Sequence, residues 1–140
     1  MIGLGCGARS YTRALHYSLD YAVRPKGVKG IIADYLARSR EELARAEHGF
    51  ALDSEEQRRR YLLQSILNTE GLNAARYACR FGSDVADDFP DLRTFAELGL
   101  LSFDGTRWTP TPFGLEQSDA LGPWFFSSRV RTLMGSYEAK

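Results

Sequence analysis

The chain has 140 residues, with 18 Lys and Arg against 18 Asp and Glu, 2 Cys, and 44% hydrophobic residues. That length suits one domain or two small subdomains and excludes a full enzyme barrel, while the hydrophobic fraction disfavours disorder. Two cysteines are too few for a tetrahedral thiolate zinc site or a self-contained iron–sulfur site, and the zero net charge removes the strongest argument for a nucleic-acid partner.

Hydropathy gives no sign of a membrane or a secretory route. No apolar run approaches the ~20 residues of a membrane span. The first residues also lack a charged region followed by a long apolar stretch, so a signal peptide is not indicated. We therefore expect a soluble protein in the reducing cytoplasm, with no membrane partner.

The first element in chain order is a glycine-rich segment. Gly3, Gly5 and Gly7 alternate, so the sequence predicts a short strand or extended turn over residues 1–12 with one face free of side chains. Such a face lets another backbone or a ligand approach closely. The G-x-G-x-G spacing is not the dinucleotide-binding G-x-G-x-x-G. Residues 13–26 are expected to be irregular.

Helices dominate the middle of the sequence. Apolar spacing predicts one helix over residues 28–47, ended by Gly49, and a second that begins at Asp53 or Ser54. The second helix carries an apolar stripe, made of Leu62, Leu63, Ile66 and Leu67. A third helix is expected over residues 73–81, capped by Asn73 and ended by Gly82.

The next segment predicts a broken helix and a hairpin. A fourth helix begins near Ser83, is broken by Pro90 and resumes as far as Gly99. Asp104-Gly105 then lies between two short strand-like runs, which is a strong hairpin signal. Thr111 is expected to cap a helix that runs to about residue 126, and a final helix covers about residues 128–138.

This order of elements over residues 53–126 (three helices, a hairpin and a helix) is that of a winged helix-turn-helix. The predicted fold class is therefore mainly α (α+β): a helical domain with a winged-helix subdomain, preceded by a single strand.

The helix that would enter a DNA groove lies within residues 84–98. It carries Asp84, Asp87, Asp88, Asp91 and Glu97 against Arg93. Phosphates would repel that surface, so we expect no DNA binding. Phe89, Phe95 and Leu98 are expected to be core residues.

Few residues suggest chemistry. His16 and His48 match no metal motif, nucleophilic catalysis by Cys6 is disfavoured, and Cys79 is expected to be a buried, inert helix residue. The aromatic run Trp124-Phe125-Phe126 favours core packing over an interface with a missing partner domain.

The basic cluster Arg58-Arg59-Arg60 leaves two interpretations open. At 100° per residue, Arg59 lies on the same side of its helix as Leu62, Leu63 and Ile66. Arg59 is therefore at the rim of the core, or it pairs with a carboxylate or a ligand group. Structural pairing is the favoured reading.

Several blocks in order resemble the oxygen-independent coproporphyrinogen III oxidase family of radical SAM proteins. Gly3-Leu4-Gly5-Cys6-Gly7-Ala8-Arg9-Ser10-Tyr11 is similar to the last strand region of that family's barrel. The later blocks are Gly49-Phe50-Ala51-Leu52, Gly71-Leu72-Asn73, Arg80-Phe81-Gly82, Leu98-Gly99-Leu100-Leu101 and the run from Trp108 to Gly114. In that last run the family has Leu-Thr, two residues and Gly. The resemblance covers essentially the whole chain, and residues 119–124 suggest a divergent branch.

The resemblance implies that the cofactors are bound by a part of the enzyme other than this chain. Family members hold a [4Fe–4S] cluster on a Cys-x3-Cys-x2-Cys loop, where S-adenosylmethionine binds and is cleaved to a radical. This chain lacks the motif and is expected to bind no cofactor itself. It resembles the C-terminal third of such an enzyme, with the barrel as its missing partner. Gly3, Gly5, Gly7, Ala8 and Arg9 would lie near S-adenosylmethionine or substrate, although Arg9 replaces an apolar residue. Arg59 matches an arginine of the family, as a substrate contact or a structural ion pair.

The implied organisation has four parts. Residues 1–26 are the last strand and exit segment of the barrel, residues 27–52 are linking helices, residues 53–126 are a winged-helix cap, and residues 127–140 form a C-terminal helix. The implied function is a cap that covers the substrate side of a radical SAM oxidoreductase and is not catalytic alone. The alternative is a free-standing winged-helix binding module, with a protein partner favoured over DNA.

Overall fold

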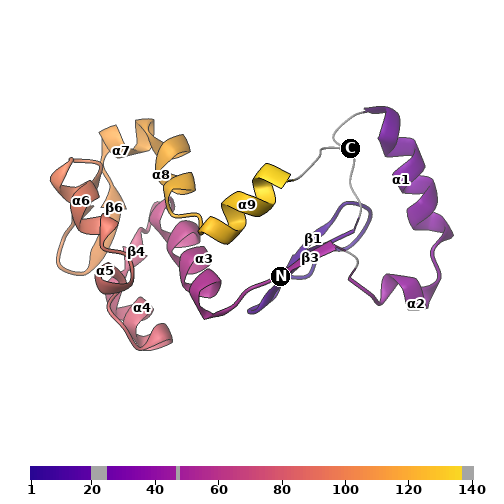
Figure 1. Cartoon of the computed structure of the whole chain (residues 1–140), viewed down its shortest axis with the longest axis horizontal. Coiled ribbons are helices and arrows are strands. Elements are labelled where there is room, and N and C mark those ends of the chain that lie inside the picture. The colour runs from indigo at the N-terminus through magenta and orange to yellow at the C-terminus, as the bar shows by residue number, and fades with distance from the viewer. Residues whose placement is uncertain (20–24, 47, 137–140) are drawn as a thin grey trace. The chain divides into compact units, whose positions relative to one another are not determined.

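A computed structural model describes residues 1–19, 25–46 and 48–136 of the chain (Figure 1). The structure divides into two units, residues 58–132 and the remainder of the described chain, and each is considered by itself. The last residues of the expected final helix, together with residues 20–24 of the expected irregular segment and Glu47 of the expected first helix, lie outside the described residues.

The first unit contains a small antiparallel sheet. Its strands are β1 (Arg9–Tyr11), β2 (Leu15–Ser18) and β3 (His48–Ala51), in the order β1-β2-β3. The expectation of a single strand followed by an irregular segment is therefore wrong at residues 15–18. The turn into β2 is closed by Thr12, whose backbone N–H donates to the carbonyl of Leu15 while its hydroxyl accepts from the N–H of Leu15. The residues of β3 that pair with β2 lie 30 to 36 positions further along the chain, beyond the reach of local patterns.

The helical part of this unit is two helices rather than the one expected over residues 28–47. Helix α1 spans Pro25–Ala37 and α2 spans Arg40–Leu43. Ser39 makes the break, because its hydroxyl accepts from the N–H of Glu42 while the Glu42 carboxylate accepts from the N–H of Ser39. This reciprocal capping box starts a new helix. The N–H of Ser39 also lowers the pKa of the exposed Glu42 carboxyl below its ordinary value.

The second unit has the element order expected for a winged helix. It runs through α3 (Ser54–Ile66, which begins in the first unit), β4 (Leu72–Asn73), α4 (Ala74–Phe81), α5 (Val85–Asp88), α6 (Asp91–Glu97), β5 (Leu101–Phe103), β6 (Arg107–Pro110), α7 (Pro112–Glu116) and α8 (Ser118–Trp124). Helix α9 (Ser128–Ser136) follows.

The helix caps of this unit are those predicted: Asp53 accepts from the N–H of Glu56, Asn73 begins α4, and Gly82 ends it in the left-handed conformation. Pro90 separates α5 from α6.

Two details of this unit differ from the expectation. A two-residue strand, β4, joins the hairpin, so the sheet has the order β4-β6-β5. Gly71 makes this pairing fit, because it has φ of +67° and a Cβ there would lie 2.6 Å from the carbonyl oxygen of Trp108. The helix expected from residue 112 to about residue 126 is α7 and α8, separated at Gln117, whose N–H is shared between the carbonyls of Phe113 and Gly114.

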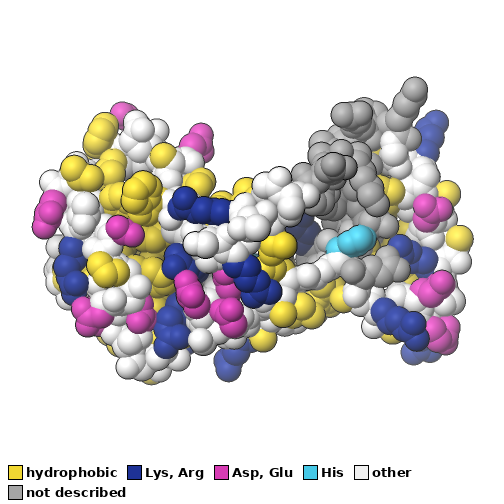
Figure 2. Space-filling view, in the orientation of Figure 1, with side chains coloured by type: hydrophobic (Ala, Val, Ile, Leu, Met, Phe, Trp, Pro, Cys, Tyr) yellow, Lys and Arg dark blue, Asp and Glu magenta, His cyan; other side chains and the backbone are white. Residues whose placement is uncertain are grey.

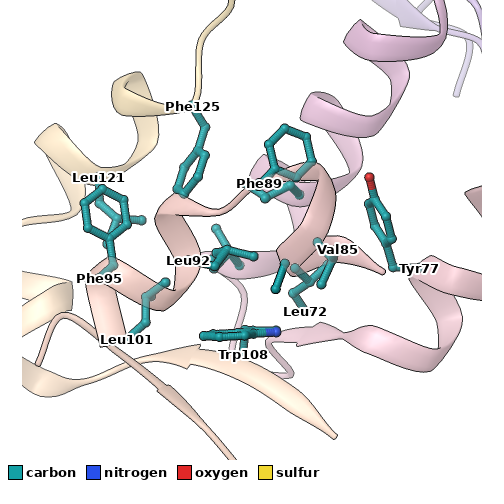
Figure 3. Close-up of a cluster of buried hydrophobic side chains, with 13 residues drawn as sticks. Leu72, Tyr77, Val85, Phe89, Leu92, Phe95, Leu101, Trp108, Leu121 and Phe125 are labelled. Atoms are coloured by element: carbon teal, nitrogen blue, oxygen red, sulfur yellow. The ribbon is translucent and has the colours of Figure 1, made fainter. Parts of the chain in front are cut away.

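A single hydrophobic core fills the second unit. Figure 3 shows its side chains converging from the helices and from β4, β5 and β6. Its members are Leu62, Ile66, Leu72, Tyr77, Val85, Ala86, Phe89, Leu92, Phe95, Leu101, Trp108, Leu121 and Phe125. Phe89 and Phe95 are buried as expected, but Leu98 is 61% exposed. At 100° per residue, Phe95 is rotated about 60° from Leu92 around the axis of α6, and both still face the core. Leu98, three residues further on, is rotated about 120° from Leu92, which places it outside the core face.

The turn after β6 explains the Thr-x-x-Gly spacing in the sequence. The Thr111 hydroxyl donates to the carbonyl of Gly99 over 2.6 Å and accepts from the N–H of Gly114 over 3.0 Å, so it both caps α7 and ties it to the hairpin. Gly114 is buried, and a Cβ built on it would lie 2.8 Å from the carbonyl carbon of Leu100 and closer still to its oxygen. Only glycine fits here.

We predict that Gly114→Ala lowers the free energy of unfolding by ~1–3 kcal/mol, because the new methyl group meets backbone that cannot move aside cheaply. Urea unfolding followed by circular dichroism measures it. Gly135→Ala is the control, since Gly135 lies in α9 with nothing within 4 Å of its built Cβ. Equal stability of the Gly114→Ala and Gly135→Ala proteins would contradict the prediction.

Candidate functional site

The glycine segment forms a closed loop. The N-terminal amino group donates to the carbonyl of Tyr11 over 3.0 Å, and the N–H of Tyr11 donates to the carbonyl of Met1 over 2.8 Å. Between these ends, Gly5 and Gly7 have φ of +103° and +70°, and the N–H of Ala8 donates to the carbonyl of Gly5. The segment therefore folds back on itself, and β1 begins only at Arg9.

The backbone that packs closely against Gly3 belongs to the same loop. A Cβ on Gly3 would lie 3.0 Å from the carbonyl carbon of Arg9 and closer to its oxygen. Ser10 is 2% exposed, and its hydroxyl accepts from the N–H of Gly3 over 3.0 Å. Gly5, by contrast, has open space around it. The structure thus brings Gly3, Gly5, Gly7, Ala8 and Arg9 into one loop, and their contact with a cofactor stays a prediction.

Arg59 and Arg58 have different partners in the second unit. The half-buried Arg59 donates from Nη1 to the carbonyl of Phe125 over 2.9 Å, and its guanidinium lies 5.4 Å from the centre of the Phe89 ring. These contacts place Arg59 at the rim of the core, while its pairing with a carboxylate or a ligand group stays a prediction. Arg58 pairs with a carboxylate, donating from Nε to Asp88 over 3.1 Å.

Asp88 is the centre of a polar cluster that sequence reasoning missed. One oxygen of its carboxylate, Oδ2, accepts from Arg58 over 3.1 Å, from the Tyr77 hydroxyl over 2.6 Å and from the Ser83 hydroxyl over 2.6 Å. Arg58 also donates from Nη2 to the carbonyl of Phe81 over 3.2 Å. By sequence, Asp88 is one of five acidic residues of the predicted groove-facing segment 84–98. Its partners are 5, 11 and 30 residues away, so no local pattern could have identified them.

The cluster shifts two pKa values in opposite directions. Burial alone raises the pKa of Asp88, but the hydrogen bonds from Ser83 and Tyr77 and the charge of Arg58 outweigh it, so the net pKa lies below the ordinary value of 3.8. The pKa of Tyr77 is raised, because burial, the hydrogen bond to Asp88 and the charge of Asp88 all disfavour the phenolate. The cluster is therefore a carboxylate held by neutral and cationic donors, which is a structural arrangement.

The described residues of the second unit line a polar cavity and an apolar cavity. One is polar, about 500 Å³, and lies between α3, β4, the start of α4 and β6, with Tyr61, Ser65, Asn73, Arg76 and Arg107 in its lining. The other is apolar and about 380 Å³. We name it the apolar groove; its lining residues are Phe95, Leu98, Leu100, Phe113, Gln117, Ala120, Leu121 and Trp124. Of the aromatic run predicted to pack in the core, Phe125 is buried and Trp124 is 54% exposed beside this groove.

The cysteines and histidines do not assemble a metal centre. Within residues 1–19, 25–46 and 48–136, no three His, Cys, Asp or Glu side chains are placed to hold a metal ion. His16 lies on β2 with its ring 4.8 Å from that of Tyr11, and His48 lies on β3. Cys6 and Cys79 are both exposed, so the expectation of a buried Cys79 is wrong: in α4 it is Tyr77 that faces the core. The helices of the described chain are all too short or too polar to cross a membrane.

We predict that Asp88→Asn destabilises the protein by ~1–3 kcal/mol at pH 7, because Arg58 loses its ionic partner in a partly buried setting. The neighbouring Asp87→Asn is the control. Its ion pair with Arg93 (2.8 Å) has side chains 70% and 56% exposed, so it is expected to change stability by under ~0.5 kcal/mol.

The Asp88 contribution should also depend on pH. Because the folded pKa of Asp88 is lowered, its stabilisation is complete above the ordinary carboxyl pKa and is lost as the pH falls through that value toward the folded pKa. The stability difference between the wild type and Asp88→Asn is therefore expected to shrink between pH 5 and pH 3, as urea titrations at each pH would measure. A difference that is constant over this range would contradict the pKa assignment.

Comparison with known proteins identifies one domain. Residues 52–116 match the family model of the HemN C-terminal domain. No curated protein and no solved structure matches the chain. The matched segment begins at the buried Leu52, directly before α3, and ends with α7, so it contains most of the winged-helix unit. This match confirms the resemblance of the chain to the C-terminal part of radical SAM proteins of the oxygen-independent coproporphyrinogen III oxidase-like family.

Proposed function

We propose that this chain is the cap of a radical SAM oxidoreductase that resembles oxygen-independent coproporphyrinogen III oxidase and that it covers the substrate side of a cluster-bearing barrel. The observation that carries the proposal is the HemN C-terminal domain over residues 52–116. The glycine loop before it supports the same reading, because it resembles the end of the family's barrel. In this role the chain belongs to cytoplasmic, porphyrin-type chemistry and is not catalytic alone.

The residues of this chain do not fit the family's iron–sulfur cluster. The cluster of a radical SAM protein needs three cysteine thiolates from one short loop, and this chain has two cysteines, 73 positions apart. The barrel therefore has to supply the cluster. When bound there, the cluster and S-adenosylmethionine would supply the radical chemistry, and this chain would contribute the surface that closes over the substrate.

The first experiment supplies the missing barrel. We would replace the C-terminal part of an oxygen-independent coproporphyrinogen III oxidase with this chain and measure cleavage of S-adenosylmethionine to 5′-deoxyadenosine under anaerobic, reducing conditions. The joined protein is expected to cleave it, whereas the chain alone, given iron, sulfide and the same reagents, is expected not to. A joined protein that folds and holds its cluster but shows no cleavage above that of the barrel alone would count against the cap role.

A genetic observation tests the same proposal independently. The DNA upstream of this reading frame, or a neighbouring gene, should encode a Cys-x3-Cys-x2-Cys loop. If the genome encodes no such barrel upstream of this chain or in a neighbouring gene, the proposal fails for this gene.

Arg9 gives a residue-level test in the joined protein. Arg9 is exposed at the start of β1, next to the glycine loop. If the loop borders S-adenosylmethionine as the resemblance implies, Arg9→Ala should raise the S-adenosylmethionine concentration for half-maximal cleavage several-fold. Arg13→Ala, exposed in the turn between β1 and β2 and outside the glycine loop, is the control and should behave as the unaltered protein. If the two variants need the same S-adenosylmethionine concentration for half-maximal cleavage, Arg9 does not contribute to the site.

The alternative function is a free-standing binding module, and for such a module a protein partner is favoured over DNA. Helices α5 and α6 present Asp87, Asp91 and Glu97 at exposed positions, and the one arginine of these helices, Arg93, is paired with Asp87. This acidic face would be repelled by phosphates. We expect no salt-sensitive DNA affinity in a fluorescence anisotropy titration at 50 mM salt; binding that weakens steeply with salt would contradict this.

A further inference from the structure

The apolar groove on the second unit is an exposed hydrophobic surface with a definite shape. It lies between α6, the start of the hairpin, α7 and α8, and Gln117 is the one polar side chain in its lining. Leu98, Phe113 and Trp124 on its walls are 61%, 53% and 54% exposed. Large apolar side chains that cluster at the surface of a water-soluble unit mark a place where another molecule binds.

The surroundings of the groove are acidic. Glu97, Glu116 and Asp119 each directly precede a lining residue, and all three are exposed. Within the described part of the chain, these three carboxylates form no hydrogen bond or ion pair. Figure 2 shows hydrophobic side chains gathered over α6, α7 and α8, with acidic side chains around them. The groove therefore suits an apolar ridge that carries positive charge at its edge.

Helix α1 has the complementary surface. Val28, Ile32 and Leu36 recur every four residues and are 42%, 44% and 76% exposed. On a helical projection Ile32 and Leu36 lie about 40° and 80° from Val28, so the three form one stripe. Lys29 lies about 100° from Val28, at the edge of the stripe, while Asp34 lies about 240° away, on the opposite side of the helix. An amphipathic helix of this kind is the usual occupant of an apolar groove.

We propose that the apolar groove binds helix α1 of a second copy of this chain. Each chain has one groove and one α1 helix, so two copies can exchange helices reciprocally and form a closed dimer. Val28, Ile32 and Leu36 would contact the groove lining, and Lys29 would lie near the carboxylates at its edge. This inference does not depend on the cap role, because it concerns the association of the chain with itself.

The test is the mass of the full chain in solution. Multi-angle light scattering across a hundredfold range of concentration should show a concentration-dependent rise from 15.7 kDa toward twice that mass. Leu98→Glu, in the groove, and Ile32→Glu, in the stripe, should each weaken the dimer at least tenfold, because each buries a carboxylate in an apolar contact. Lys29→Glu should weaken it more modestly, by repulsion from the acidic edge.

Matched controls separate this contact from a general effect of surface charge. Met134→Glu alters a side chain as exposed as Leu98 (60% against 61%), and Leu43→Glu one as exposed as Ile32 (41% against 44%). Neither Met134 nor Leu43 lies in α1 or in the groove lining, so both proteins should associate like the wild type. Circular dichroism of each variant should match that of the wild type, since all five substituted positions are exposed.

Mixing gives the most specific readout. The Leu98→Glu chain keeps an intact α1 and the Ile32→Glu chain keeps an intact groove, so an equimolar mixture can form one of the two contacts. The mixture should therefore dimerise more strongly than either variant alone.

Three results would overturn the proposal: a chain that is monomeric throughout, a dimer that both Leu98→Glu and Ile32→Glu leave intact, or a mixture no stronger than its components. A monomeric chain in which Ile32→Glu alters tryptophan fluorescence would assign α1 to the groove of its own chain instead. None of these outcomes bears on S-adenosylmethionine cleavage by the joined protein.

Discussion

The fold of the winged-helix unit depends on one carboxylate oxygen. Oδ2 of Asp88 accepts hydrogen bonds from Arg58 on α3, from Tyr77 in the middle of α4 and from Ser83 in the turn before α5, and so holds these elements at one point. Helices α5 and α6 have four and seven residues, too few to be stable in isolation. Partial burial of the carboxylate carries a desolvation cost, which three donors and one positive charge offset. Around this point a chain of aromatic rings, from Tyr61 through Tyr77 and Phe89 to Phe125, continues the packing into α8.

A second constraint shapes the surface of the same unit. Thr111 and Gly114 fix α7 against the carbonyls of Gly99 and Leu100, at the base of the hairpin. This contact fixes the turn from hairpin to helix, and the break at Gln117 then sets α8 after it. The apolar groove is the space that these elements leave next to α6. Thr111 and Gly114, which belong to the family-like run from Trp108 to Gly114, thus fix the position of α7. The interaction is expected at the exposed apolar side chains of the groove beside α7.

Several polar groups among the described residues are engaged in contacts within the chain. The strongest polar cluster, around Asp88, is consumed by structural hydrogen bonds, and the glycine loop satisfies its own backbone through Ser10 and Tyr11. Arg59, placed by the sequence beside the core, is engaged by a backbone carbonyl and an aromatic ring. The surfaces for which binding is proposed are the acidic, partly apolar face of the winged-helix unit and the apolar stripe on α1.

The sequence by itself determined the features that arise from local chemistry. Caps at Asp53, Asn73 and Thr111, the left-handed Gly82, the break at Pro90 and the Asp-Gly hairpin each depend on residues within a few positions, so the winged-helix order followed from them. Tertiary structure decided what depends on distant partners: the pairing of β2 with β3 and of β4 with β6, the choice of Arg58 rather than Arg59 for Asp88, and the exposure of Leu98, Cys79 and Trp124. Helical periodicity indicates which side chains share a face, but only the packed neighbours decide whether that face is covered.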